Sequence, residues 1–106
     1  MIAARFPLPA RRAAETFVLP FGGQGQSFHV TVGYYPNGDV GEIFISGAKA
    51  GSDVEAVARD GAVLISLAIQ YGVPLETIRH ALTREQDGLP STIIGAVVEQ
   101  LTGVDK

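Results

Sequence analysis

Three short stretches in the first half of the chain alternate apolar with polar residues, which is the spacing of half-buried β-strands. They run over residues 15–21, 27–35 and 40–46. The glycine-rich residues 22–26 join the first two stretches. The second two are joined through Asn37–Gly38, a pair that favours a tight hairpin turn. The pattern therefore predicts a three-stranded antiparallel β-meander.

Helical spacing replaces this alternation in the second half of the chain. Ser52 and Glu55 form a capping box, in which each side chain pairs with a free N–H at a helix start. A long helix is predicted from there over about residues 53–71. Pro74 begins a second helix, and Ser91 caps a third. Because three strands precede three helices, we predict an α+β fold with the helices packed on one face of the sheet.

The long helix carries most of its polar residues in one narrow stripe. At 100° per residue this stripe is about 60° wide, and it contains Glu55, Arg59, Ser66 and Gln70. Since polar residues of a helix normally face water, we expect the stripe to be exposed. Leu64, about 150° away, should then point into the core. On this interpretation, Leu64→Ala costs roughly 2–5 kcal/mol of stability.

A chain of 106 residues is the size of one domain, and its 46% of hydrophobic residues can fill a core. Residues 1–14 mix Pro, Arg and Ala without a sustained period, so we interpret them as an N-terminal arm or linker. Residues 15–104 form the predicted single domain. Deleting the arm should leave this domain folded, because the arm has no periodic apolar face with which to join the core.

Composition excludes several kinds of chemistry. The chain has no cysteine, which rules out disulfides, thiolate metal sites and cysteine-based catalysis. His29 and His80 have no pair of carboxylates at ligand spacing, so neither a metal nor another cofactor is expected. The formal charge of −3 argues against a general nucleic-acid surface. No apolar stretch approaches the ~20 residues of a membrane span, and no signal-peptide pattern is visible, so we expect a cytoplasmic protein without a membrane partner.

One candidate ligand site lies at the turn into the long helix. Lys49, Ser52 and Asp53 stand in a glycine-containing segment, and the free N–H groups of a helix start can bind a phosphate or another anion. The segment lacks the full Walker spacing. The Asp53 carboxylate also occupies the favourable field of the helix dipole already. A capped structural turn is therefore the competing interpretation.

A candidate protein interface lies on the sheet face opposite the helices. Alternation places Phe44 and Thr31 on this face, with Tyr35 beside them, so apolar surface is left open there. Arg11 and Arg12 in the arm add charged groups that a partner can contact. The aromatic residues also fit single-stranded nucleic acid, although the net charge opposes it. Scattered solvated charge remains the alternative for the arginines.

Four segments between Leu8 and Leu82 form an ordered set: LPARR followed by ETF within residues 8–17, NGDVGEIFI at 37–45, KAGS at 49–52 and LAIQYGVPLE at 67–76. In this order they resemble the TSCPD domain at the C-terminus of adenosylcobalamin (vitamin B12)-dependent ribonucleotide reductases. The resemblance covers most of the chain. Each segment alone is also what a hairpin or a helix corner requires, so it is their combined order that is specific.

The resemblance implies an accessory domain, because the radical chemistry, cobalamin and substrate of those reductases belong to a large separate barrel. The Thr-Ser-Cys-Pro-Asp motif that names the family is missing here, as are all cysteines, so no catalytic residue carries over. We therefore expect a free-standing, cysteine-less relative without catalytic machinery. Its partner would be a protein, either a ribonucleotide reductase or a second copy in a homodimer. The alternative is a small-ligand sensor that binds a nucleotide or another anion at Lys49, Ser52 and Asp53.

Overall fold

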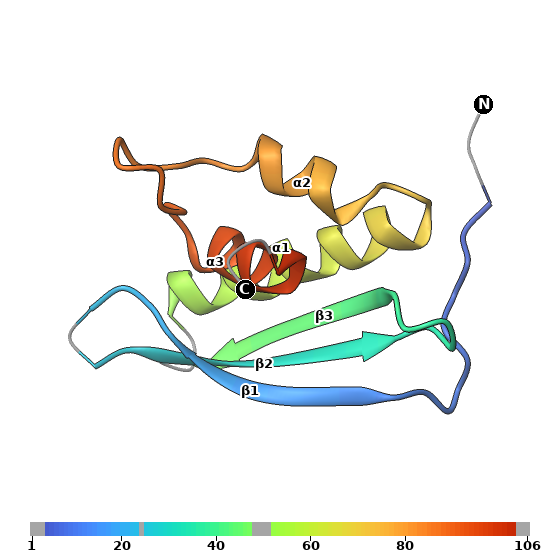
Figure 1. Ribbon diagram of the computed structural model, residues 1–106. Helices are drawn as coiled ribbons and strands as arrows, with labels where there is room; N and C mark the ends of the chain where they lie inside the picture. Colours follow the sequence, from blue (N-terminus) through green and yellow to red (C-terminus); the bar gives the residue numbers. More distant parts are fainter. Residues whose placement is uncertain (1–3, 24, 48–51, 104–106) are drawn as a thin grey trace.

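The computed structural model describes residues 4–23, 25–47 and 52–103 (Figure 1). It contains one antiparallel sheet, in which the strands lie in the order β1-β2-β3, and three helices that follow it in the chain. The elements are β1 (Ala14–Pro20), β2 (Ser27–Tyr34), β3 (Val40–Gly47), α1 (Asp53–Gln70), α2 (Leu75–Ala81) and α3 (Ile93–Thr102). The predicted α+β fold is confirmed, and Figure 1 shows the helices on one side of the sheet.

The core lies between the sheet and the helices α1 and α3. Alternate residues of the strands face it, as the sequence pattern requires. In one cross-strand row, Val30 of β2 lies between Phe17 of β1 and Ile45 of β3. The helices complete the core, whose buried apolar residues are Phe28, Val30, Val32, Ile43, Ile45, Ala58, Ala62, Ile65, Ile93, Val97 and Val98.

Helix α1 is turned the opposite way from the prediction. Its polar residues Ser66 and Gln70 are buried, at 8% and 4% exposure, and Glu55 is buried with them. Leu64, which we expected in the core, is 66% exposed. The interpretation of the polar stripe as a solvent-facing surface is therefore wrong. Of the four stripe residues, only Arg59 is exposed, and Ser66 and Gln70 face β3.

The outer edge of β3 explains this orientation. In the described sheet, β3 pairs with β2 along one edge, which leaves the N–H and C=O groups of its other edge without strand partners. The Ser66 hydroxyl accepts a hydrogen bond from the Ile43 N–H at 2.8 Å and lies 3.1 Å from the Ile43 carbonyl oxygen. The Gln70 amide donates to the Gly41 carbonyl at 2.9 Å. Polar side chains of α1 thus take the place of a fourth strand.

Small residues let α1 approach the sheet closely enough for these bonds. Ala58 and Ala62 precede Ser66 at four-residue intervals on the same face of the helix, and both are buried. The Ser66 hydroxyl also lies 2.9 Å from the Ala62 carbonyl oxygen one turn earlier. The buried face of α1 therefore combines small residues for close approach with polar residues for the strand edge.

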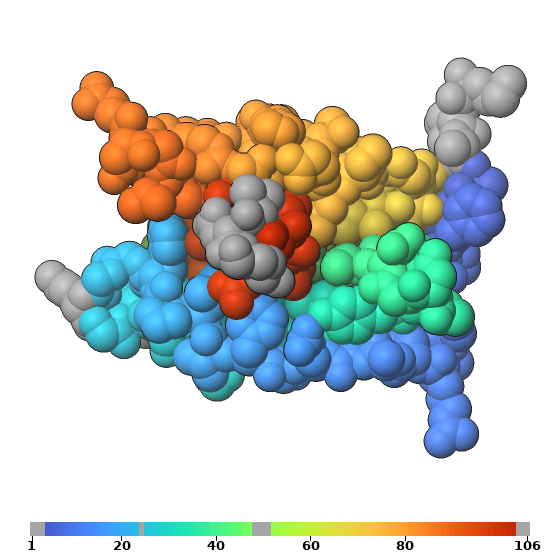
Figure 2. Space-filling model, in the orientation of Figure 1, coloured from blue at the N-terminus to red at the C-terminus, as the bar shows by residue number. Residues whose placement is uncertain are grey.

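The N-terminal arm packs against the domain (Figure 2). Arg5 Nε donates to Gln70 Oε1 at 2.7 Å, and the Phe6 N–H donates to the Gln70 carbonyl at 2.8 Å. The Tyr35 hydroxyl donates to the Phe6 carbonyl at 2.5 Å. Leu8 lies over Gly41, where a Cβ atom would come within 2.8 Å of its Cδ2. Since these contacts reach buried groups, deleting the arm should cost stability, contrary to what its irregular pattern suggested.

The N-cap of the third helix lies one residue later than expected. The Thr92 hydroxyl accepts from the Gly95 N–H at 3.0 Å and is the N-cap of α3. Ser91, which we expected in this role, instead donates its hydroxyl proton to Glu85 at 2.6 Å. Both residue types cap helices well, so the sequence did not distinguish between the two positions.

The orientation of α1 can be tested with two substitutions. Ser66→Ala leaves the buried Ile43 N–H without its partner and should lower the free energy of unfolding by about 1–3 kcal/mol. Leu64→Ala should change it by less than about 0.5 kcal/mol in a dilute, monomeric sample, because the side chain is exposed. Urea denaturation measures both. If Leu64→Ala were the more damaging substitution, α1 would face the sheet with its apolar side after all.

Candidate functional site

Of the expected anion site, the structure describes Ser52 and Asp53, and the Ser52 hydroxyl already has a hydrogen-bond partner. Ser52 is the N-cap of α1, and its hydroxyl accepts from the Glu55 N–H at 3.1 Å. Asp53 is exposed at the helix start. Two carboxylates, those of Asp53 and Glu55, therefore stand in the first turn, where they already interact with the helix dipole. Lys49 lies outside the described residues.

The outer sheet face brings together part of the expected interface. Thr16, Thr31 and Phe44 form one cross-strand row there, and the hydroxyls of the two threonines are 3.0 Å apart. Phe44 is 50% exposed, and Val18 in the neighbouring row is exposed as well. Tyr35 does not join them. Its ring lies against Gly41, where a Cβ atom would be 2.9 Å from the ring, and its hydroxyl binds the arm.

Arg12 crosses the end of this outer face and pairs with a buried carboxylate. Its Nε donates to Glu42 Oε2 at 2.5 Å, and its guanidinium also donates to the Pro9 carbonyl at 2.6 Å. The Glu42 side chain lies directly over Gly33 and occupies the space that a Cβ atom would need there. Arg11 is exposed beside this pair. Arg12 thus holds the arm to the sheet, whereas Arg11 remains accessible.

Two hydrogen-bonded groups have shifted pKa values. The Tyr34 hydroxyl donates to Glu15, and this bond together with burial raises the pKa of Tyr34 to about 12. The hydrogen bond from Arg84, 2.7 Å long, lowers the pKa of Glu99 below its ordinary value. Arg79 supports this shift, since its Nε lies 3.3 Å from the same carboxylate, although without hydrogen-bond geometry. Arg79 of α2 and Arg84 of the following loop therefore both bind Glu99 and hold these two segments to α3.

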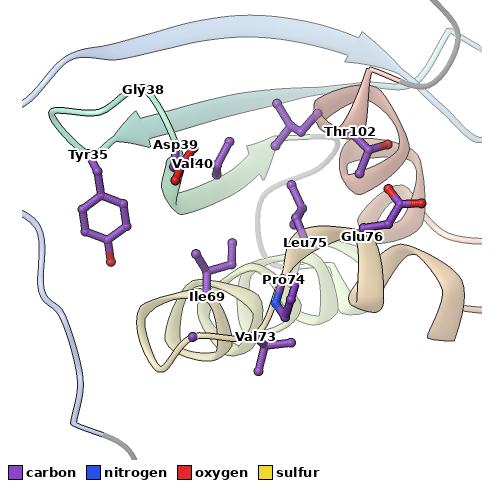
Figure 3. Close-up of a pocket in the computed structure, with 12 residues that line it drawn as sticks. Tyr35, Gly38, Asp39, Val40, Ile69, Val73, Pro74, Leu75, Glu76 and Thr102 are labelled. Carbon is purple, nitrogen blue, oxygen red and sulfur yellow. The ribbon is translucent and has the colours of Figure 1, made fainter.

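A cavity of about 520 Å³ lies between the β2–β3 turn, the α1–α2 junction and the end of α3 (Figure 3). Its charged lining consists of two carboxylates, Asp39 and Glu76, and no lysine or arginine lines it. Glu76 is already paired with Arg79 at 2.9 Å and with His80 at 3.0 Å. Such a lining disfavours a phosphate. The described residues also contain no group of three or more His, Asp or Glu that could hold a metal ion.

A group of exposed apolar side chains along α1 was not foreseen from the sequence. We call it the α1 outer stripe, and it consists of Val57, Leu64, Leu67 and Tyr71, with Asp60 among them. Val57 is 62% exposed and Leu64 66%. Val54 and Val63 flank the stripe and are half exposed. Exposed apolar side chains grouped on one side of a helix make this stripe a candidate contact surface.

Comparison with known proteins assigns this sequence to a family. The model of the TSCPD domain matches residues 4–105, which is nearly the whole chain and includes the arm. The chain belongs to the TSCPD domain family. The resemblance noted from four sequence segments is thus confirmed.

The relatives of this TSCPD domain are much longer proteins. It is 39% identical over 79 residues, 74% of its length, to the vitamin B12-dependent ribonucleotide reductase of Agrobacterium fabrum. Identity is 44% over 54 residues, 51% of the chain, with the enzyme of that name from Rhodopirellula baltica, and 34% over 70 residues, 66% of the chain, with that from Streptantibioticus cattleyicolor. The matched segments span 6%, 5% and 11% of those reductases. No solved structure matches the chain.

Within the residues described for this TSCPD domain, no helix is long and apolar enough to cross a membrane.

The contribution of the Arg12–Glu42 ion pair to stability can be tested by substitution, with the neighbouring residue Arg11 as the control. Arg12→Met keeps much of the side-chain length but leaves the Glu42 carboxylate without its charged donor. We expect a loss of about 1.5–3 kcal/mol in the free energy of unfolding, as for other hydrogen bonds to charged groups. Arg11→Met, at an exposed site, is the matched control and should be nearly neutral. Equal effects in chemical denaturation would show that Arg12 does not anchor the arm.

The lowered pKa of Glu99 predicts a specific dependence on pH. A carboxylate whose pKa is lower in the folded chain stabilises the fold above its unfolded pKa of about 4.3, and this stabilisation is lost as the pH falls through the folded value. Glu99→Gln should therefore be less stable than the native chain at neutral pH, with the difference shrinking below about pH 4. Urea denaturation between neutral and acidic pH measures it. A difference that stays constant with pH would contradict the charged pairing.

Proposed function

We propose that this TSCPD domain is a non-catalytic accessory domain whose function is to bind a protein through the α1 outer stripe. The observation that carries the proposal is the exposure of Val57 and Leu64 on the longest helix of the domain. Burial of apolar surface stabilises association by roughly 25 cal/mol per Å² before the entropic costs of binding are subtracted. The stripe therefore offers a driving force for association.

The inner face of α1 supports this interpretation, because it fixes the rotation of the helix. Ser66 and Gln70 hold the edge of β3, so α1 cannot turn its apolar side inward without breaking these bonds. Leaving the buried backbone groups of β3 unpaired would cost about 1–3 kcal/mol each. The fold itself thus keeps the apolar stripe at the surface. Binding of a partner would bury it.

The relatives suggest where such a domain is used. They are B12-dependent ribonucleotide reductases, and the chain corresponds to a small fraction of their length. A domain of this size without cysteines is suited to an accessory role beside reductase chemistry rather than to the chemistry itself. Association with a ribonucleotide reductase, in the cytoplasm, is the setting that this kinship favours. The alternative of a nucleotide or anion sensor gains no support from Ser52, whose hydroxyl is used in capping α1.

Association that depends on Leu64 tests the proposed function. We suggest sedimentation of the chain alone and with a purified B12-dependent ribonucleotide reductase from which the matching segment has been removed. Leu64→Asp should weaken any complex by tenfold or more, because it places a charge in the apolar stripe. Leu89→Asp is the matched control, since Leu89 is equally exposed but lies in the loop before α3.

Two results would contradict this function. One is a chain that stays monomeric and leaves the reductase unbound at high concentration. The other is a complex that forms equally well with Leu64→Asp, because its interface would then lie elsewhere. A thermal-shift measurement with nucleotides, showing strong stabilisation, would favour the sensor instead.

A further inference from the structure

We propose that the occupant of the α1 outer stripe is a second copy of this chain, bound with its own α1 antiparallel to the first. The inference rests on the proposed function, in that it assumes the stripe to be a protein-binding surface, and it specifies the partner. Two-fold symmetric homodimers are self-complementary, so each residue of the stripe must find a suitable counterpart within the same stripe.

The spacing of the stripe fits a helix as its partner. Val57, Asp60, Leu64, Leu67 and Tyr71 are separated by three, four, three and four residues. This alternation is the seam along which two helices pack side by side at a shallow angle, with knobs of one helix in the holes of the other. A flat or loop-shaped partner would not require a straight seam of this kind.

Asp60 and Tyr71 indicate that the partner helix is α1 of a second copy. When two antiparallel α1 helices are related by an axis midway between Leu64 and Leu67, Leu64 faces Leu67 of the other copy and Asp60 faces Tyr71. The phenol can then donate a hydrogen bond to the carboxylate, and symmetry forms this bond twice. Within the described chain, neither side chain has a hydrogen-bond or ion-pair partner. A parallel arrangement would instead place Asp60 against Asp60, which like charge disfavours.

A groove beside the first half of α1 fits the same arrangement. Its volume is about 410 Å³, and it is lined mainly by apolar side chains, among them Phe21, Val54, Val57 and Ile94. In the antiparallel pair, Val57 faces the segment that follows the other α1, where Val73 is partly exposed. The second copy would thus bring apolar residues to this groove as well as to the seam.

Oligomeric state in solution tests the pairing first. Analytical ultracentrifugation of the chain should show a dimer that dissociates on dilution. Leu64→Asp should be monomeric with an unchanged circular dichroism spectrum, whereas Leu89→Asp should remain dimeric. Tyr71→Phe and Asp60→Asn should each weaken the dimer about tenfold, and the double variant should be little weaker than either one, because both remove the same bond.

Disulfide trapping tests the antiparallel register. Because the chain has no native cysteine, any disulfide must form between the introduced cysteines. A mixture of the Asp60→Cys and Tyr71→Cys variants should cross-link between chains on mild oxidation. Neither variant alone should do so, because like positions lie 11 residues, or about 16 Å, apart along the seam. Cross-linking of Asp60→Cys with itself would overturn the antiparallel pairing.

Failure of the dimer and failure of the proposed function give different results. A chain that is monomeric at 100 times the concentrations used for binding, but whose association with a reductase depends on Leu64, would overturn the second copy as occupant and leave the protein-binding function in place. A monomeric chain without any association that depends on Leu64 would overturn both. A dimer that survives Leu64→Asp would place the contact on another surface and would also overturn the inference.

Discussion

The hydrogen bonds between α1 and the open edge of β3 determine the rest of the structure. A three-stranded sheet has two edges, and unpaired backbone groups in a buried edge destabilise the fold. Ser66 and Gln70 pair with Ile43 and Gly41 on one of these edges. Because both polar residues lie on one face of α1, this pairing fixes the rotation of the helix about its axis. The rotation in turn determines which side chains of α1 are exposed to solvent.

Two consequences follow from that rotation. Gln70 is placed where the arm can reach it, and Arg5 and Phe6 bind its side chain and its backbone. The arm, β3 and α1 are therefore joined around one buried amide. On the opposite face of α1, Leu64 and its neighbours in the outer stripe are left in water. The same bonds that complete the sheet thus create the surface that we propose for protein binding.

Much of the fold was predictable from the sequence because its signals are local. Alternation, the Asn37–Gly38 turn and the capping residues identified three strands and three helices in the right order. The rotation of α1 was not predictable from amphipathicity, since that rule assumes that polar residues seek water rather than a strand edge. A signal was nevertheless present: small or polar residues at positions 58, 62, 66 and 70 mark a face built for close approach. Similarly, alternation placed Phe44 and Thr31 together on the sheet, but not Tyr35, which follows the irregularity at the end of β2.

The exchange of the Ile43 amide proton with solvent reports whether α1 covers the edge of β3. An edge-strand amide without a partner exchanges quickly, whereas an amide held in a hydrogen bond exchanges only when the structure opens. We predict that Ile43, bonded to Ser66, is protected to a similar degree as Phe44, whose cross-strand partner is Thr31 in β2. Exchange of Ile43 at the rate of an unprotected edge amide, with Phe44 still protected, would show that α1 does not cover the edge of the sheet.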